Sequence, residues 1–290
     1  MKAIDKISKE THRENANVGN NFSSKLLQIA SSSNKVFNLL NMPEWMSKAH
    51  EDGDIHIHDL DSYNLTINCL QIDVEEVLKR GFNTGYGKIN PPGRIESAAA
   101  LMCILLQSSQ NDMFGGQSIF SLEDTMRDYV VKTEQEIIKE VNEALQLLPE
   151  GDINSREYDK LIRTKLEKRV RQAMQAIVYN LNSMHSRAGS QVPFSSINLG
   201  IPRDEYGEMV CRMFLEEFNK GLGNGEIPIF PNVIFRLKDG VNLRPSDPYY
   251  HLKQLAVKVA ANRMNPTFLN CDATFNKVLY DQGILPATMG

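Results

Sequence analysis

Strand-like runs alternate with helical patterns through the second half of the sequence, and this alternation limits the possible folds more than any other feature. The alternating segments are, in chain order, residues 192–200, 205–222, 227–235, 249–263, 266–272 and a run that begins at 285. Such alternation predicts an α/β fold, either an open sheet or a barrel. Pro228 and Pro231 predict a bulged or edge position for the strand that contains them.

Helical patterns dominate the first half of the chain. Residues 22–46 read as a helix in two pieces, with a break near Asn41 and Pro43. Residues 95–107 are apolar on nearly all sides, which predicts a buried helix that carries Cys103 in the interior.

Two long helical patterns, at residues 122–148 and 157–184, are joined by a short break that contains Pro149 and Gly151. Together they predict a helical hairpin over residues 122–184. Both helices are partly polar, so the hairpin is either a solvated flank or a subunit interface, and the residues alone leave both alternatives open.

Composition sets the broad class of protein. The chain has 290 residues, of which 41% are hydrophobic and 23% charged, values typical of a soluble globular protein. The formal net charge of −4 argues against a general affinity for nucleic acid, which needs a basic surface. The four cysteines form no CxxC pair, and no apolar run approaches the ~18 residues of a membrane span. These features predict a soluble, cytoplasmic protein.

The stretch from residue 52 to 73, DGDIHIHDLDSYNLTINCLQID, holds the densest group of chemically able side chains. It contains His56, His58 and Cys69, and its apolar pattern over 65–72 predicts a buried strand. A strand would fix the Cys69 thiol in position. The alternative is that Cys69 is a small buried hydrophobe, the commoner role of a lone cysteine in an intracellular chain.

Other chemistries are weaker hypotheses. His56 and His58 would project to the same face of a strand and could share a metal ion. Beyond His50, however, no further histidine lies nearby, so we predict no metal site. The sequence contains no GxSxG elbow, which disfavours a serine hydrolase, and the surroundings of Cys69 match no thiol hydrolase signature.

Two polar clusters, SSQN at residues 108–111 and GGQS at 115–118, follow the predicted buried helix. A buried polar group without a partner costs roughly 1–3 kcal/mol. The clusters therefore need hydrogen-bond partners, which either neighbouring backbone or a bound substrate can supply.

Five motifs, in this order along the chain, carry a resemblance to one family. They are ENAN at 14–17, HIHDLDSYNLTINCLQID, RGFNTGYG, QSSQNDMFGGQS and NLNSMHSRAGSQVPFSSINLG. With them the sequence closely resembles the large subunit of the anaerobic (class III) ribonucleoside-triphosphate reductases, which are glycyl radical enzymes. The resemblance extends from about residue 14 to the end. It implies a homodimer and a ten-stranded α/β barrel made of two antiparallel half-barrels.

The resemblance also implies a reaction, the reduction of ribonucleoside triphosphates to deoxyribonucleoside triphosphates. In the family a C-terminal glycyl radical oxidises a cysteine, and the resulting thiyl radical removes the 3′ hydrogen of the substrate. Cys69 matches a second cysteine, which donates a proton and a hydrogen atom at C2′ while the 2′ hydroxyl leaves as water. This role needs a neutral thiol, and therefore a dry, uncharged setting.

The resemblance places further polar residues in the substrate cavity. They are His56, His58, Asn68, Ser108, Ser109, Gln110, Asn111, Arg187, Ser190, Gln191, Ser195 and Ser196. Among them, Arg187 and the serine hydroxyls suit contacts with ribose and phosphate.

Partners follow from the same resemblance. A radical-SAM iron–sulfur enzyme would install the glycyl radical. The effectors ATP, dATP, dGTP and dTTP, with Mg, would bind near the subunit interface, where the 122–184 hairpin is the candidate element. We expect no nucleic-acid or membrane partner.

The sequence departs from the family at its C-terminal end. There the family's ATM-G, here residues 287–290, runs directly into Cys-Arg, and that cysteine forms the thiyl radical. The sequence also lacks the family's glycyl radical segment, its structural zinc site and the ATP-cone domain that precedes many catalytic domains. We therefore expect residues 1–290 to be the N-terminal portion of the barrel domain and to be inactive alone, without a substitute role for Cys271.

Two other functions stay open. The chain could be a half-barrel that binds nucleotides or effectors without chemistry. It could also belong to a different glycyl radical enzyme that acts on an acyl or diol substrate, although the HIH and SSQN runs follow the reductase pattern.

Overall fold

The chain forms two compact units in the computed structural model, which describes residues 22–63, 67–146, 154–186 and 190–289. Unit 1 consists of the residues up to 70 together with 107–115 and 184–193. Unit 2 consists of residues 71–106, 116–183 and 194–290. The predicted ENAN motif at 14–17 and the predicted substrate residue Arg187 lie outside the described residues.

Unit 2 is organised around a five-stranded sheet in the order β1-β4-β5-β6-β7. The strands are β1 (Leu70–Ile72), β4 (Gln117–Ile119), β5 (Ser195–Leu199), β6 (Asn232–Leu237) and β7 (Thr267–Asn270). The pairs β4–β5, β5–β6 and β6–β7 are all parallel. The predicted α/β class is therefore confirmed.

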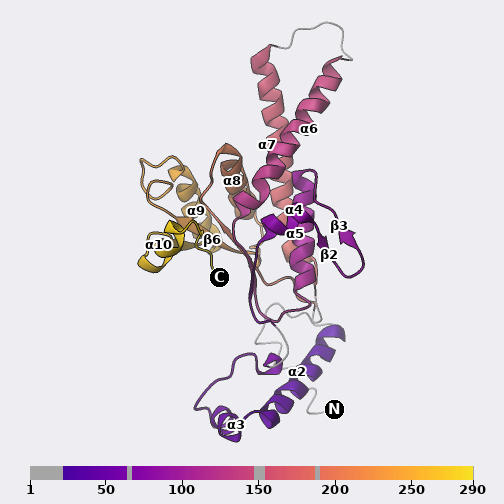
Figure 1. Ribbon diagram of the computed structural model, residues 1–290, viewed down its shortest axis with the longest axis vertical. Helices are drawn as coiled ribbons and strands as arrows, with labels where there is room; N and C mark the ends of the chain where they lie inside the picture. Colours follow the sequence, from indigo (N-terminus) through magenta and orange to yellow (C-terminus); the bar gives the residue numbers. More distant parts are fainter. Residues whose placement is uncertain (1–21, 64–66, 147–153, 187–189, 290) are drawn as a thin grey trace. The chain divides into compact units, whose positions relative to one another are not determined.

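Helices connect the strands of unit 2 (Figure 1). They are α4 (Val74–Arg80), α5 (Ile95–Ser109), α6 (Leu122–Gln146), α7 (Ser155–Ser183), α8 (Glu205–Lys220), α9 (Tyr250–Arg263) and α10 (Thr274–Asp281). Helix α8 packs against α6, α7 and α9, while α6 and α7 also pack on each other. A small antiparallel pair, β2 (Phe82–Asn83) and β3 (Lys88–Ile89), forms within the glycine-rich loop.

The apolar face of α8 shows why the sequence folds in this way. Met209, Met213, Phe214 and Phe218 recur at helical spacing, and all four are fully buried. Burial of one such side chain stabilises the fold by roughly 1.5–3 kcal/mol. Asp204 begins the helix, because its side chain accepts hydrogen bonds from the amides of residues 206 and 207 at 3.1 and 3.0 Å.

Three strand predictions need correction. Strand β6 lies between β5 and β7, so the predicted edge position is wrong; the strand begins at Asn232, and Pro228 and Pro231 precede it. The described residues from 284 to 289 form no strand. Strand β4 was not predicted, because polar residues fill two of its three positions.

Unit 1 contains α2 (Phe22–Asn41), α3 (Glu44–Glu51) and the 3-10 turn η1 (Leu60–Ser62). The predicted break between two helical pieces is confirmed. Polar contacts join α2 to η1: Asn38 donates to the carbonyl of Leu60 at 2.6 Å, and Ser31 donates to the carboxylate of Asp61 at 2.6 Å.

The strand predicted over 65–72 is confirmed only in part. In the described residues of that stretch, β1 covers the last three positions, and an isolated parallel bridge between Ile67 and Met113 precedes it. The histidine-bearing part further upstream is not extended, because Gly53 and Asp59 adopt left-handed backbone conformations and the turn η1 follows.

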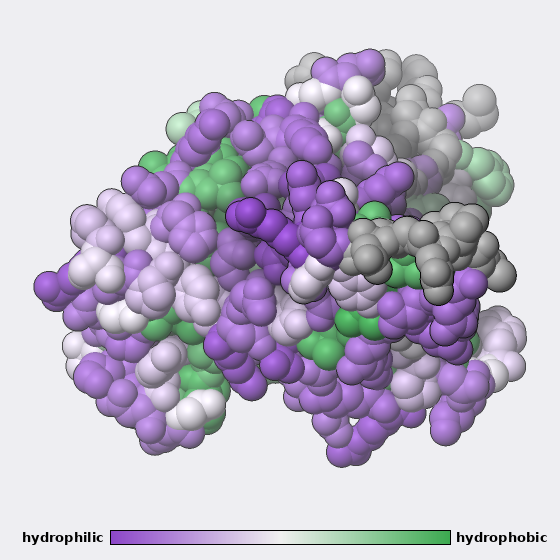
Figure 2. All heavy atoms as spheres, turned by 90° about the horizontal axis from the view of Figure 1, so that it is seen from above, coloured by the Kyte–Doolittle hydropathy of each residue, from purple (hydrophilic) through white to green (hydrophobic). Residues whose placement is uncertain are grey.

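The face shown in Figure 2 is mostly hydrophilic where it is coloured, with smaller apolar patches between the polar side chains. In the described residues no helix is both long enough and apolar enough to span a bilayer.

Candidate functional site

Cys69 lies directly before β1, and its side chain is exposed. The other three cysteines, at positions 103, 211 and 271, are buried. The predicted position within a buried strand is therefore wrong for Cys69. The structure also excludes the alternative that Cys69 is a packed hydrophobe, because its thiol is open to solvent in this chain.

A close backbone approach fixes the neighbours of Cys69. The amide of Gly115 donates to the carbonyl of Asn68 at 2.6 Å. A Cβ at Gly115 would collide with that carbonyl and would lie 2.8 Å from Asn68 Oδ1 and 3.0 Å from Cys69 Sγ. Glycine is needed at 115 because any side chain there would push the Cys69 segment away.

Gln110 reinforces this arrangement from the SSQN cluster. Its side chain is fully buried, and its Nε2 donates to the carbonyl of Gly115 at 3.2 Å. The structure therefore brings three predicted site residues, Asn68, Cys69 and Gln110, together around Gly115. Gln110 acts by positioning the glycine.

The rest of the SSQN cluster ends α5. Asn111 donates from its backbone to the carbonyl of Ser108 at 3.1 Å, and from its side chain to Ser108 and Gln107 at 3.2 and 3.3 Å. Ser108 and Asn111 are exposed, whereas Ser109 is half-buried. Neighbouring backbone thus satisfies much of the polar cluster without a ligand.

His50, His56 and His58, all in unit 1, form a row. Ring centroids of His50 and His56 lie 5.9 Å apart, and those of His56 and His58 lie 6.0 Å apart. His56 and His58 are exposed, and His58 Nε2 lies 3.3 Å from a carboxylate oxygen of Asp59. The backbone here is not a strand, so the predicted shared strand face is wrong. Among the described residues, no group of three histidine, cysteine or acidic side chains could hold a metal ion.

Ser190 and Gln191 lie in the loop before β5. Ser190 has a positive φ of 57°, and Gln191 is buried, with its carbonyl accepting from the amide of Ser186 at 3.0 Å. Both belong to unit 1. The carbonyl of Gln191 therefore holds this loop by accepting from both the amide and the hydroxyl of Ser186.

Ser195 and Ser196 are the first two residues of β5 and belong to unit 2. Both are buried, and as neighbours in a strand they point to opposite faces of the sheet. The Oγ of Ser195 has no hydrogen-bond partner among the residues that the structure describes. A buried hydroxyl in this state costs roughly 1–3 kcal/mol, and such orphan groups mark places where a further partner is accommodated.

A polar cluster in unit 2 was not predicted from the sequence. It consists of Gln71, Ser118 and Asn198. These side chains come from β1, β4 and β5, and each bonds to the backbone of residue 287 or 288. Asn198 had a detectable signal, since it is an amide in the middle of the apolar run INL.

A buried ion pair was also missed. Glu123 and Arg236 are both fully buried and lie 2.8 Å apart. Glu123 also accepts from the amides of Gly200 and Ile201 at 2.9 and 2.8 Å, so one carboxylate holds the end of β5, the start of α6 and the middle of β6 together. Burial, followed by the nearby charge of Glu123, raises the pKa of Cys211 well above its usual value.

Burial also keeps the other interior thiols neutral. It raises the pKa of Cys103 to about 12 and that of Cys271 to about 11. A thiol with such a pKa carries almost no thiolate at neutral pH and is a poor nucleophile.

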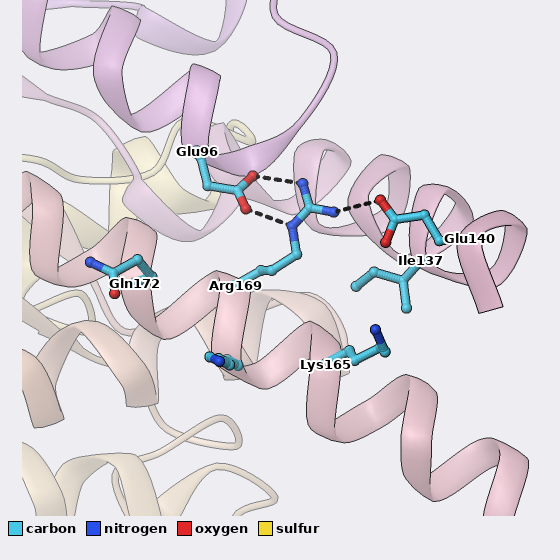
Figure 3. A pocket seen from close by; sticks show the side chains of 7 residues that line it. Glu96, Ile137, Glu140, Lys165, Arg169 and Gln172 are labelled. Carbon is cyan, nitrogen blue, oxygen red and sulfur yellow. Dashed lines mark hydrogen bonds and ion pairs between the residues drawn. The ribbon is translucent and has the colours of Figure 1, made fainter. Parts of the chain in front are cut away.

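A cavity of about 330 Å³ lies among α5, α6 and α7. Its lining residues are Glu96, Ile137, Glu140, Lys165, Lys168, Arg169 and Gln172 (Figure 3). Arg169 reaches across it from α7 and bonds to both carboxylate oxygens of Glu96 at 2.6 and 3.1 Å. Burial, the largest single influence, would raise the pKa of Glu96. The hydrogen bond from Arg169, a backbone hydrogen bond and the charges of Arg169 and Arg94 together outweigh it, and the pKa lies below its usual value.

Comparison with known proteins gives a match over nearly the whole chain. The family model described as anaerobic ribonucleoside-triphosphate reductase matches residues 14–290. The anaerobic ribonucleoside-triphosphate reductase of Enterobacteria phage T4 is 31% identical over 292 residues, which cover 99% of this chain and 46% of the phage protein. The Haemophilus influenzae protein of the same name is 31% identical over 252 residues, covering 86% of this chain and 34% of that protein. The chain thus spans between a third and a half of these relatives.

Solved structures agree in fold. The anaerobic ribonucleotide reductase from Thermotoga maritima with glycerol in the active site superposes with a TM-score of 0.68 at 15% identity, covering 99% of this chain and 48% of that one. The structure of the same enzyme in complex with dATP and CTP gives a TM-score of 0.63, with 93% and 46% covered. At this identity the likeness carries the fold and nothing finer.

Proposed function

The chain belongs to the anaerobic ribonucleoside-triphosphate reductase family, and from this premise we propose that it forms the first part of a catalytic subunit that converts ribonucleoside triphosphates to deoxyribonucleoside triphosphates. The observation that carries the proposal is the exposure of Cys69. Cys69 is the one exposed thiol among the chain's four cysteines, and it lies in the motif on which the family resemblance rests.

In this proposal Cys69 works at C2′ of the ribose. Its thiol donates the proton with which the 2′ hydroxyl leaves as water, and the resulting thiolate takes a proton back from solvent. The regenerated thiol then gives a hydrogen atom to C2′. The two electrons of the net reduction come from an external reductant, formate or a dithiol protein, which also restores the thiol. The close approach of Gly115 supports a fixed thiol, since the Cys69 segment and the segment up to Gly115 are locked by a 2.6 Å backbone hydrogen bond. Positioning of this kind is a large part of enzymatic rate enhancement.

The substrate's polar groups would meet the remaining predicted residues. His56 and His58 are exposed and offer ring nitrogens to a triphosphate or ribose. The orphan Oγ of Ser195 offers a hydrogen bond that nothing else in the described chain takes up. Ser196, Ser190, Gln191, Asn68 and the SSQN cluster complete the proposed lining, together with Arg187.

The sheet supports a half-barrel. A five-stranded sheet in which β4, β5, β6 and β7 run parallel suits one half of a ten-stranded barrel. The second half would come from the portion that the relatives have beyond the length matched here. The same portion would carry the glycyl radical, which supplies the oxidising equivalent, and the structural zinc site.

Effector binding is assigned to the hairpin of α6 and α7. The cavity there combines three cationic side chains, Lys165, Lys168 and Arg169, with room for part of a nucleotide. In support, one Thermotoga maritima structure holds dATP in what is named its specificity site. ATP, dATP, dGTP and dTTP, with Mg, are the proposed effectors. The hairpin would also serve the homodimer, and a radical-SAM iron–sulfur enzyme would be the activating partner in the cytoplasm.

The test compares two cysteine variants in a complete reductase subunit that carries this sequence. Cys69→Ala should abolish deoxyribonucleotide formation while retaining affinity for the ribonucleoside triphosphate. Cys271→Ala is the matched control, because that thiol is buried and has no proposed role. Turnover that survives in Cys69→Ala would refute the mechanism. Nucleotide binding without turnover in the wild type would favour the alternative of a binding half-barrel.

A further inference from the structure

Three neighbouring strands each give one side chain to the same short piece of backbone. Gln71 Nε2, from β1, donates to the carbonyl of Ala287 at 3.2 Å. Ser118 Oγ, from β4, donates to the carbonyl of Thr288 at 2.9 Å. Asn198, from β5, donates to the same Thr288 carbonyl at 3.0 Å. All of these residues belong to unit 2.

Asn198 does more than donate to one carbonyl. Its Oδ1 accepts from the amide of Thr288 at 3.0 Å, so its carboxamide pairs with both the N–H and the C=O of one residue. A neighbouring strand makes the same two-point contact in a ladder. The side-chain amide therefore replaces a strand for a segment that, over residues 284–289, forms neither helix nor strand.

We call the contacts of Gln71, Ser118 and Asn198 with residues 287 and 288 the clamp, and two of its side chains lie in the interior of unit 2. Asn198 and Ser118 are fully buried. Asn198 also donates to Ser118 Oγ and to the carbonyl of Ile119, both at 2.9 Å. The three acceptors around the NH₂ group share its two protons, and each polar side-chain atom of Asn198 and Ser118 has a partner.

Burial of this amide is hard to explain as packing. Ile197 and Leu199, the neighbours of Asn198 in β5, are apolar and fully buried, but they point to the opposite face of the sheet. The face that carries Asn198 also carries Ser118, so the polar groups are gathered on one side of the sheet. A buried amide is costly unless its hydrogen bonds are all made. The partner it has lies 90 residues further along the chain. The amide thus fixes a distant segment at one place on the sheet.

We propose that Asn198, assisted by Ser118 and Gln71, is a positioning residue that sets the path of the chain over residues 287–289. The inference rests on the proposed function. In a reductase this face of the sheet would line the half-barrel. A segment that is hydrogen-bonded to β4 and β5 at Thr288 would then hold a fixed position relative to the reacting centre. Asn198 touches no substrate in this proposal and acts through the segment.

The first experiment is hydrogen exchange on the protein with Asn198→Ala. Exchange at residues 287–289 should rise by about tenfold or more, while the amides of β5 and β6 keep their protection. The matched control is Asn242→Ala. Asn242 is also fully buried, and it also binds backbone, donating to Gly200 and Arg236 at 2.6 and 2.8 Å. That control should leave exchange at 287–289 unchanged. Equal exchange in wild type and Asn198→Ala, or loss of protection through the whole sheet, would overturn the clamp.

The second experiment measures turnover in a complete subunit that carries this sequence. Asn198→Ala should lower kcat by about tenfold or more with KM unchanged, because a misplacement of about 1 Å costs up to ~100-fold in rate. Ser118→Ala, which removes one of the bonds to Thr288, should have a smaller effect in the same direction. Asn242→Ala should leave kcat unchanged. An active wild type with an unaltered kcat in Asn198→Ala would overturn the positioning role, whereas an inactive wild type would overturn the proposed function itself.

Discussion

Helices α2 and α8 are both amphipathic, yet they bury opposite faces. On α8 the apolar side chains are inside, and Met209 and Phe214 are fully buried. On α2 the apolar side chains are outside: Phe37 is 61% exposed and Leu40 is 79% exposed, while the buried residues are polar, among them Asn38. Unit 2 therefore holds its own hydrophobic core, and unit 1 is held to a larger degree by hydrogen bonds.

This contrast separates the candidate residues by their surroundings. Cys69, His56 and His58 belong to unit 1, in which few apolar groups are buried around them. Asn198 and Ser195 belong to unit 2, which has the larger hydrophobic core. Regions with few buried apolar contacts open more easily than packed cores. The Cys69 segment therefore depends more on its hydrogen bonds, such as that between Gly115 and Asn68, than on packing.

The largest expected difference comes from the same substitution on the two helices. Phe214→Ala on α8 should lower the free energy of unfolding by about 3–5 kcal/mol, because it leaves a cavity in a fully buried face. Phe37→Ala on α2 should change it by no more than about 0.5 kcal/mol, as expected for an exposed side chain. Urea denaturation of both variants measures this. Similar losses for the two variants would mean that the contrast between the helices is wrong.

The next effect tests the polar part of the core in unit 2. Glu123→Gln should destabilise the protein by about 3 kcal/mol, because Arg236 is left as an unpaired buried charge. The value lies at the lower end for such changes, since glutamine still accepts from the amides of Gly200 and Ile201. Lys79→Ala, which breaks an exposed pair with Glu75, is the control and should cost about 0.5 kcal/mol or less. An equal cost for both variants would show that the buried pair contributes little.

The smallest effect is a pH dependence at the cavity of α5, α6 and α7. The folded pKa of Glu96 lies below its usual value, so its pairing with Arg169 stabilises the fold above the unfolded pKa of about 4.3 and is lost as the pH falls through the folded pKa. The stability difference between wild type and Glu96→Gln should be constant from pH 7 to about 5 and shrink below about 4. Because the pair is partly exposed, the difference should be about 1 kcal/mol or less. Urea midpoints at several pH values measure it, and a difference that grows on acidification would contradict the assigned sign.

The elements best predicted from the sequence are those whose apolar period is long. The helices at 95–107, 205–222 and 249–263 were expected within a few residues of their observed bounds, because each repeats its pattern over three turns or more. Strand β4 escaped prediction because Gln117 and Ser118 are polar. They are buried there because Gln117 donates to the carbonyl of Leu106 and Ser118 to that of Thr288.

The surroundings of the candidate site residues could not be predicted from the sequence. Motifs selected Cys69, but the apolar pattern around it predicted a buried strand, whereas the thiol is exposed beside Gly115. Long-range partners decide such details, and spacing along the chain does not report them. For the same reason the pairing of Asn198 with Thr288 could not be foreseen.

The most direct test of the central claim is the rate at which Cys69 is alkylated, followed by mass spectrometry on a complete subunit that carries this sequence. With iodoacetamide alone, Cys69 should be modified long before the buried Cys103, Cys211 and Cys271. With saturating CTP the modification of Cys69 should slow at least several-fold, because the thiol would face the bound ribose. An unchanged rate of Cys69 alkylation while CTP is shown to be bound would contradict the account.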